Sequence, residues 1–228
     1  GLPRFMDIPG ENYIGVMSSN EYLTRVNLMG AGRQGWKTPV IKGKRVAVIG
    51  GGNTAMDSCR TARRMGAEEV YIVYRRSEAE MPARVEEVHH AKQEGVTFLT
   101  LHNPVEYLAD ENGRVRAMRL QRMELGEPDA SGRRSPVPVE GDIVEVPVDE
   151  VIVSVGVSPN PLIPSTIPGL ETTRRGTIVA DEATLETTVP MLFAGGDIVR
   201  GGATVILAMG DGRRAAAAMD RALSQHDI

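Results

Sequence analysis

The stretch that decides the fold is Val46-Ala47-Val48-Ile49-Gly50-Gly51-Gly52-Asn53-Thr54-Ala55. Its four apolar residues are typical of a short buried strand, which the three glycines then end. In residues 53–65, small side chains recur at helical spacing, and Gly66 is a typical helix stop. Residues 70–74, Val-Tyr-Ile-Val-Tyr, are the next expected strand. Together these pieces predict one β-α-β unit with parallel strands and a right-handed crossover.

The glycines between the first strand and the helix fit the pattern G-x-G-x-x-A. Gly50 would allow the tight turn, Gly52 would let a pyrophosphate approach the backbone, and Ala55 would permit close helix–strand packing. The phosphates would then meet the free N–H groups of the helix start, near Asn53 and Thr54. The alternative is a glycine-rich turn without a ligand. Residues 30–35 also match G-x-G-x-x-G, but no strand precedes them, so we interpret them as an exposed turn.

The end of the second strand indicates which dinucleotide would bind. An acidic residue there would favour NAD, whereas Arg75, Arg76 and Ser77 follow this strand. Two guanidinium groups and a hydroxyl suit a 2′-phosphate, so the sequence favours NADP(H). Arg84 is a further candidate for the same phosphate. The alternative interpretation is a solvated basic pair at a strand end.

Beyond residue 78 the pattern changes from helical to strand-like. We expect a helix over residues 79–94 and a strand over 96–101. Three antiparallel strands should follow as an inserted meander, over residues 105–109, 115–125 and 143–148. A parallel strand over residues 151–155 should then return to the first sheet. Further on we expect short strands at residues 177–180 and 191–194 and a helix over 204–223.

A glycine-rich turn, Gly195-Gly196-Asp197, stands between an expected strand and that last helix. A carboxylate beside backbone N–H donors can hold a ribityl hydroxyl, while the helix start faces the pyrimidine edge of a flavin. An ordinary helix cap is the alternative interpretation of this turn.

Composition excludes several classes of partner. The 228 residues carry 26 Lys and Arg against 30 Asp and Glu, a net charge of −4, so neither nucleic acid nor an anionic membrane surface is an expected partner. No apolar stretch is long enough to span a bilayer. The single cysteine, Cys59, excludes a disulfide framework and favours a reducing, cytoplasmic location. No metal site is predicted, because the adjacent His89 and His90 would point in different directions on a helix.

Several motifs together resemble the flavin-containing small subunit of bacterial NADPH-dependent glutamate synthase. The related flavoprotein subunits of ferredoxin:NADP transhydrogenases, which are similar to sulfide dehydrogenase, look equally similar. The motifs are Gly-Gly-Gly-Asn-Thr-Ala-Met-Asp (50–57), Tyr-Arg-Arg (74–76), Met-Pro-Ala (81–83), Glu-Leu-Gly-Glu-Pro-Asp (124–129), Val-Gly-Val-Ser-Pro-Asn-Pro (155–161) and Phe-Ala-Gly-Gly-Asp (193–197).

This resemblance implies that NADPH binds, that its hydride passes to FAD and that electrons continue through iron–sulfur clusters to a partner. It implies an α/β fold: a Rossmann-like NAD(P)-binding domain with a parallel sheet and an inserted antiparallel β-meander, followed by the C-terminal segment of an incomplete FAD-binding domain. The expected boundaries are a connecting segment (1–44), the NADPH-binding domain (45–160), a crossing segment (161–184) and the C-terminal part of the FAD-binding domain (185–228).

The resemblance also implies the site residues and partners. NADPH contacts are expected at Gly50, Gly52, Asn53, Thr54, Ala55, Arg75 and Arg76; FAD contacts at Gly196, Asp197 and Thr204; and a further cofactor contact at Gly156. The FAD and iron–sulfur region that begins such proteins has no counterpart in residues 1–228. We therefore expect that region, and a large subunit or ferredoxin-type redox partner, to complete the enzyme. The alternative function is a stand-alone NADPH-binding module with a sensing or structural role.

Overall fold

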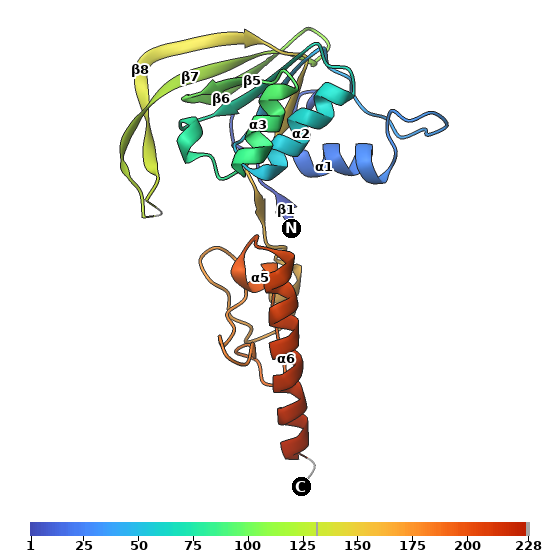
Figure 1. The fold of residues 1–228 in the computed structure, drawn as a ribbon, viewed down its shortest axis with the longest axis vertical. Helices are drawn as coiled ribbons and strands as arrows, with labels where there is room; N and C mark the ends of the chain where they lie inside the picture. The colour runs from blue at the N-terminus through green and yellow to red at the C-terminus, as the bar shows by residue number, and fades with distance from the viewer. Residues whose placement is uncertain (131, 227–228) are drawn as a thin grey trace. The chain divides into compact units, whose positions relative to one another are not determined.

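The computed structural model describes residues 1–130 and 132–226, which form two compact units (Figure 1). Residues 3–156 make the larger unit, and the chain from Val157 onward makes the smaller one together with the first two residues.

A five-stranded parallel sheet forms the centre of the larger unit. Its strands, in spatial order, are β2 (Val16–Ser18), β9 (Glu150–Val153), β3 (Arg45–Ile49), β4 (Glu69–Tyr74) and β5 (Thr97–Thr100). Every neighbouring pair is parallel, and Val48 of β3 lies opposite both Ile72 and Ile152. The predicted β-α-β unit and the strand that returns to the sheet after the meander are therefore confirmed.

The two faces of this sheet are covered by different layers (Figure 1). Val46 and Val48 pack with the helices α1 (Ser19–Leu23), α2 (Asn53–Arg64) and α3 (Val85–Gln93). Because successive strand residues point to opposite faces, Ala47 and Ile49 pack instead with the antiparallel sheet. A strand buried on both sides explains why β3 is apolar throughout its centre rather than alternating.

The antiparallel sheet is the predicted meander. It consists of β6 (His102–Ala109), β7 (Val115–Pro128) and β8 (Arg134–Pro147), in that order. The hairpin between β7 and β8 is longer than expected, because β7 continues to Pro128 and β8 already begins at Arg134. Pro136 and Pro138 are tolerated because β8 is the outer strand of the sheet.

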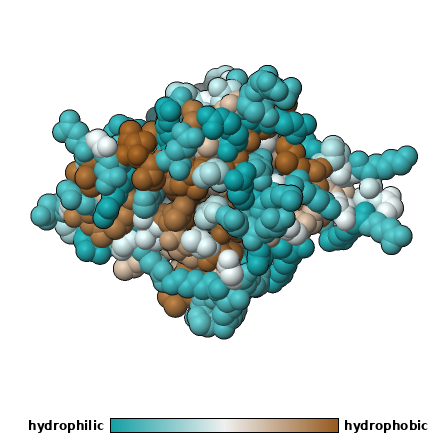
Figure 2. All heavy atoms as spheres, turned by 90° about the horizontal axis from the view of Figure 1, so that it is seen from above, coloured by the Kyte–Doolittle hydropathy of each residue, from teal (hydrophilic) through white to brown (hydrophobic). Residues whose placement is uncertain are grey.

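Apolar side chains also reach the surface of the larger unit. Val137, Ile143 and Val144 of β8 are between 40 and 52% exposed. On the face drawn in Figure 2, hydrophilic atoms dominate the rim and hydrophobic atoms gather toward the middle. Because Ile143 and Val144 are successive residues of β8, their side chains point to opposite faces of the sheet, and both faces of this outer strand are partly exposed.

The first 44 residues do more than connect. They supply the edge strand β2 and helix α1, whose N-cap Ser18 accepts a hydrogen bond from the Glu21 amide at 3.2 Å. A single π-helical turn, η1 (Thr24–Leu28), follows α1. The larger unit therefore starts at Pro3, not at Arg45, because strand β2 completes the sheet beside β9. Residues 30–35 form turns, as predicted, but Gly30 and Ala31 are buried and only residues 32–35 are exposed.

Helix α3 starts later than the expected residue 79. A short 3₁₀ turn, η2 (Glu78–Glu80), occupies the start of the expected range, and the helix begins at Val85. Pro82 explains the break, because the residue before a proline is disfavoured in the helical region.

The smaller unit contains helices α4 (Leu162–Thr166), α5 (Asp197–Arg200) and α6 (Val205–His226). Strands β1 (Leu2–Pro3) and β10 (Val157–Ser158) form a two-stranded sheet. The expected strands at 177–180 and 191–194 are wrong: Ile178, Ala180 and Phe193 form only isolated bridges, because no continuous partner strand pairs with them. In the part of the chain that the structure describes, no helix has both the length and the apolar character needed to cross a membrane.

One buried carboxyl group lies in the parallel sheet outside any predicted site. Glu150, the first residue of β9, is 1% exposed, and its Oε2 accepts a hydrogen bond from the Gly43 amide at 3.0 Å. Oε1 has no hydrogen-bond partner among the described residues. Burial raises the pKa of Glu150 to about 7, although the Gly43 amide acts in the opposite direction.

We predict that this burial makes the stability of the larger unit depend on pH. The native state favours protonated Glu150, so its contribution is fully present below pH 4.5 and is lost as the pH rises to about 7. The difference between those two pKa values corresponds to about 3 kcal/mol. Glu150→Gln should therefore raise the free energy of unfolding at pH 8 by up to about that amount, with little effect at pH 4.

Urea unfolding of the chain between pH 4 and pH 8 measures this difference. The neighbouring Asp149→Asn is the matched control, because Arg45 lies 2.9 Å from Asp149 and the pKa of this carboxyl is lowered despite partial burial. That variant should lose stability at neutral pH instead. A Glu150→Gln curve parallel to that of the unmodified chain would contradict the prediction.

Candidate functional site

The glycine loop between β3 and α2 is shaped by steric limits at the first two of its three glycines. Gly50 has φ +138, and a side chain there would overlap the carbonyl oxygen of Ser154. At Gly51 a Cβ atom would lie 2.8 Å from the Tyr74 ring. Gly52 differs, because a Cβ atom there would meet nothing within 4 Å. Open space thus lies beside Gly52, at the start of α2, where the sequence predicts that a pyrophosphate approaches.

The start of α2 is tied to the segment that precedes α3. The Asn53 side-chain oxygen accepts a hydrogen bond from the Arg84 amide at 2.9 Å, and the Gly51 carbonyl accepts one from the Ala83 amide at 3.1 Å. Thr54 is exposed in the first turn of α2, whereas Ala55 is fully buried against the sheet. The structure therefore brings Asn53 and Arg84, predicted from separate motifs, to one place.

The three residues after β4 do not share one environment. Arg75 is exposed, whereas Arg76 is only 6% exposed. The Arg76 guanidinium donates to Asp129 Oδ2 at 2.6 Å and to the Arg134 carbonyl at 2.7 Å. The Ser77 hydroxyl donates to the Glu80 carboxylate. This arrangement differs from the expectation that both arginines and the hydroxyl face a phosphate, because only Arg75 is left on the surface.

Glu80 joins the same group of contacts. It is 8% exposed, and the Arg134 guanidinium donates to its Oε1 at 2.6 and 2.7 Å. The hydrogen bond from Ser77, followed by the contacts from Arg134, holds the pKa of Glu80 below its usual range. We call Arg76, Ser77, Glu80, Asp129 and Arg134 the hairpin clasp, because they join the segment after β4 to the β7–β8 hairpin.

Gly156 lies near the same edge of the sheet. The Ser154 amide donates to the Ile49 carbonyl at 2.7 Å, so the end of β9 lies beside the glycine loop. Gly156 follows two residues later with φ +96, and a Cβ atom there would meet nothing within 4 Å. The candidate residues of the larger unit thus gather at the carboxyl ends of β3, β4 and β9, where ligands bind in open parallel sheets.

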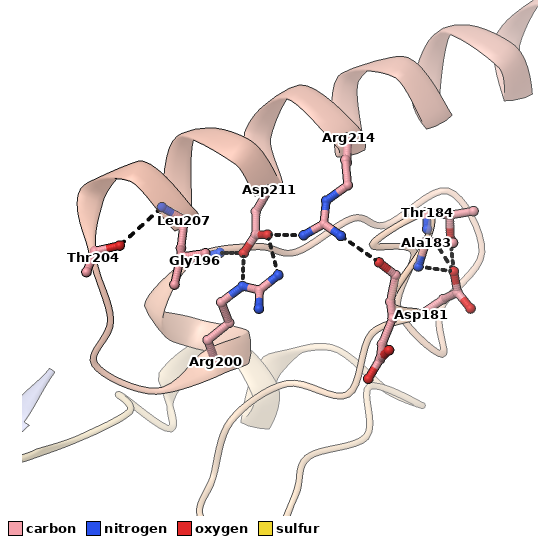
Figure 3. A network of polar contacts seen from close by, with 10 residues as sticks. Asp181, Ala183, Thr184, Gly196, Arg200, Thr204, Leu207, Asp211 and Arg214 are labelled. Atoms are coloured by element: carbon pink, nitrogen blue, oxygen red, sulfur yellow. Dashed lines mark hydrogen bonds and ion pairs between the residues drawn. The ribbon is translucent and has the colours of Figure 1, made fainter.

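The second candidate region is the turn before α5 in the smaller unit (Figure 3). Gly196 is the N-cap of α5 with φ 72, and Asp197 is the exposed first residue of that helix. Asp197 Oδ1 accepts a hydrogen bond from the Ala203 amide at 3.2 Å. Thr204 precedes α6, and its hydroxyl lies 3.4 Å from the Leu207 amide. The three predicted residues of this region therefore lie in two successive helix starts.

A buried carboxylate, Asp211 of α6, holds the turn in place (Figure 3). Its Oδ2 accepts hydrogen bonds from the Gly196 amide at 2.9 Å and from Arg200 Nε at 2.6 Å. Its Oδ1 accepts from Arg200 at 2.7 Å and from Arg214 at 2.5 Å. The Arg200 guanidinium, followed by the Gly196 amide, holds the pKa of Asp211 well below its usual range.

Sequence reasoning missed Asp211, Asp129 and Glu80. Each is an acidic residue whose role depends on a partner that the local pattern does not identify. The only available signal for Asp211 is its position between Gly210 and Gly212 in an otherwise alanine-rich helix.

The comparisons with known proteins agree on the fold. Residues 1–219 match the family described as pyridine nucleotide-disulphide oxidoreductase. The chain is 45% identical over 223 residues to the NADP(+)-dependent formate dehydrogenase subunit beta of Moorella thermoacetica, covering 96% of this chain and 30% of that protein. It is 44% identical to a putative glutamate synthase [NADPH] small chain of Cereibacter sphaeroides, covering 93% and 52%. The chain thus spans about half or less of the length of these relatives.

Solved structures with similar folds come from more distant proteins. FprA of Mycobacterium tuberculosis, in complex with NADPH, superposes with a TM-score of 0.75 at 21% identity, covering 98% of this chain and 62% of that chain. Lactococcus lactis thioredoxin reductase superposes with a TM-score of 0.67 at 20% identity, covering 96% and 62%.

We predict that Asp211 is required to keep the Gly196 turn ordered. Asp211→Ala removes the acceptor of the Gly196 amide and leaves Arg200 and Arg214 without their shared carboxylate. Hydrogen exchange of the Gly196 amide, followed by NMR, should accelerate by about tenfold or more. Asp220→Ala, at an exposed position of the same helix, is the control and should leave this rate unchanged. Equal exchange rates in the two variants would show that the turn is ordered without Asp211.

Proposed function

The chain belongs to the pyridine nucleotide-disulphide oxidoreductase family, and from this premise we propose that it is the NADPH-binding part of a flavin-dependent oxidoreductase subunit. The observation that carries this proposal is the glycine loop at the start of α2, with open space beside Gly52 and with Arg84 hydrogen-bonded to Asn53. When bound, NADPH supplies a hydride and FAD accepts it and releases single electrons. The residues of the chain bind and orient these groups.

The nucleotide would bind at the carboxyl ends of β3 and β4. The amides of Asn53 and Thr54 begin α2, so they can donate to a pyrophosphate, favoured by the partial positive charge of the helix start. Arg75 and Arg84 are both exposed and are the residues that we assign to the 2′-phosphate. Arg76 forms an ion pair with Asp129, so it would stabilise the site without contacting the phosphate itself. Gly156 would lie beside the nicotinamide end, because β9 ends next to the glycine loop.

The smaller unit would contact the flavin. Asp197 is an exposed carboxylate that can accept a hydrogen bond from a ribityl hydroxyl, and Gly196 leaves the approach free of a side chain. Helix α6 is 22 residues long, so its start carries a partial positive charge that would stabilise negative charge on the pyrimidine edge of a bound flavin. Thr204 stands immediately before this helix. Sequence reasoning and the observed helix starts both support this assignment.

Electron transfer would need more protein than these residues. The relatives are named as a subunit beta and a small chain, and they are longer than this chain. We propose that a further FAD and iron–sulfur region of the same subunit completes the flavin site, and that a large subunit or a ferredoxin-type protein accepts the electrons. Glutamate synthesis is the favoured overall reaction. A single buried thiol, Cys59, suits the reducing cytoplasm.

A stand-alone NADPH-binding module is the second candidate function. The observation that favours it is that the larger unit contains its own sheet, helices and glycine loop, so it needs no flavin to bind a nucleotide.

We predict that the chain binds NADPH more tightly than NADH and that Arg75→Ala combined with Arg84→Ala removes this preference. Charge-assisted hydrogen bonds to a phosphate contribute up to about 1.5–3 kcal/mol each, and less at exposed sites, so NADPH affinity should fall about tenfold or more. Calorimetric titration measures both affinities. Arg122→Ala, which removes an exposed arginine of β7, is the control. Equal affinities for the two nucleotides in the unmodified chain would refute the assignment.

A second prediction separates the two candidate functions. The purified chain should contain no stoichiometric FAD, because the sequence contains only one glycine loop in a strand–helix context and FAD needs a second one for its pyrophosphate. Extending the chain with the remaining region of a longer relative should produce flavin absorbance and NADPH oxidation. An extended protein that binds NADPH but never flavin would favour the stand-alone module.

A further inference from the structure

We propose that the hairpin clasp is a positioning device that sets the preference for NADPH over NADH. It would do so by holding the segment 75–84 in the geometry in which Arg75 and Arg84 meet the 2′-phosphate. This inference rests on the proposed nucleotide site, and it assigns a role in selectivity to the antiparallel sheet, which otherwise only covers a face of the core.

The clasp joins the segment 75–84 to residues on both sides of the turn between β7 and β8. Arg76 donates to Asp129 and to the Arg134 carbonyl, at the two sides of the turn between β7 and β8. The side chain of Arg134 returns to the segment and donates to Glu80. One residue of the hairpin, Arg134, thus accepts from Arg76 through its backbone and donates to Glu80 through its side chain.

Main-chain hydrogen bonds reinforce the same connection. The Arg76 carbonyl accepts from the Leu101 amide at 3.1 Å, and the Leu101 carbonyl accepts from the Met123 amide of β7 at 2.8 Å. The Tyr74 hydroxyl donates to the Glu80 carbonyl at 2.9 Å. Side-chain and backbone contacts therefore both fix the position of the segment.

Two members of the clasp are buried, whereas the side chains of their partners Asp129 and Arg134 are 30% and 49% exposed. The side chains of Arg76 and Glu80 are each 8% exposed, so water screens their charges much less than it screens those of exposed pairs. Each of these two buried side chains has an oppositely charged partner within hydrogen-bonding distance, which buried charges require. Loss of Asp129 or Arg134 would remove the opposite charge from a buried side chain.

The segment that the clasp holds is the segment that carries the exposed arginines. Arg75 precedes Arg76 directly, and Arg84 follows Glu80 by four residues and is itself fastened to Asn53. A segment held in place before binding loses little conformational entropy when the phosphate arrives. NADH has no 2′-phosphate to engage these arginines, so its affinity should not depend on the clasp.

The test is calorimetric titration of the chain with NADPH and with NADH, comparing the ratio of their dissociation constants among variants. Glu80→Ala removes the acceptor of Arg134 and Ser77, and should lower the preference for NADPH by about fivefold or more. Glu80→Gln keeps an acceptor oxygen and should retain most of the preference. Asp129→Ala, which removes the acceptor of Arg76, should lower it in the same direction, and it decides the question if Glu80→Ala does not fold by circular dichroism.

Glu106→Gln is the matched control, because it breaks an exposed ion pair with Arg119, at 2.8 Å, in the same antiparallel sheet. Its ratio should equal that of the unmodified chain. A merely structural clasp would weaken both nucleotides equally, and that result would overturn the proposal. A stronger NADPH preference in Asp129→Ala would also overturn it, because Arg76 would then be a phosphate ligand that Asp129 keeps away from the phosphate.

The two proposals fail in different ways. If the unmodified chain does not discriminate between NADPH and NADH, the proposed nucleotide site is wrong and the role of the clasp falls with it. If the unmodified chain prefers NADPH and the clasp variants keep the same preference, only the clasp proposal is overturned.

Discussion

At the end of β3 the chain turns where the Ser154 carbonyl leaves no room for a side chain, and the larger unit is organised around this steric constraint. Gly50 can occupy the position because it tolerates a positive φ. The turn allows α2 to start directly after the strand and to return across the sheet. It also allows the end of β9 to lie against β3, so that the strand ends, the helix start and the nucleotide residues share one edge.

The parts of this arrangement that the sequence predicts are those governed by neighbouring residues. The apolar run of β3, the spacing of small residues in α2 and the run of β4 each identify an element without information from elsewhere in the chain. The same holds for the meander, whose alternation reflects one buried face. Asn53 and Arg84 are both predicted as nucleotide contacts, and the structure connects them by a hydrogen bond.

The features that the sequence does not predict depend on partners far along the chain. Arg75 and Arg76 have the same neighbours in the sequence. Arg76 is nevertheless buried, where its guanidinium donates to Asp129, 53 residues later. The length of the β7–β8 hairpin decides this contact, because β7 and β8 extend well beyond the expected strands at residues 115–125 and 143–148. Asp211 is a similar case, because its structural role depends on the Gly196 amide and the two arginines that donate to it. Residues 177–180 have a strand-like composition, yet only isolated bridges form there.

The prolines of β8 also limit the pairing of its outer edge with a strand from another copy of this protein. An outer strand normally presents a row of unpaired amide donors, onto which a strand from another chain can add and so begin an aggregate. Pro136 and Pro138 have no such donors to offer, and both lie in the half of β8 nearest the turn. The hairpin can therefore extend to Asp129 and Arg134 while its outer edge remains a poor template for intermolecular strand pairing.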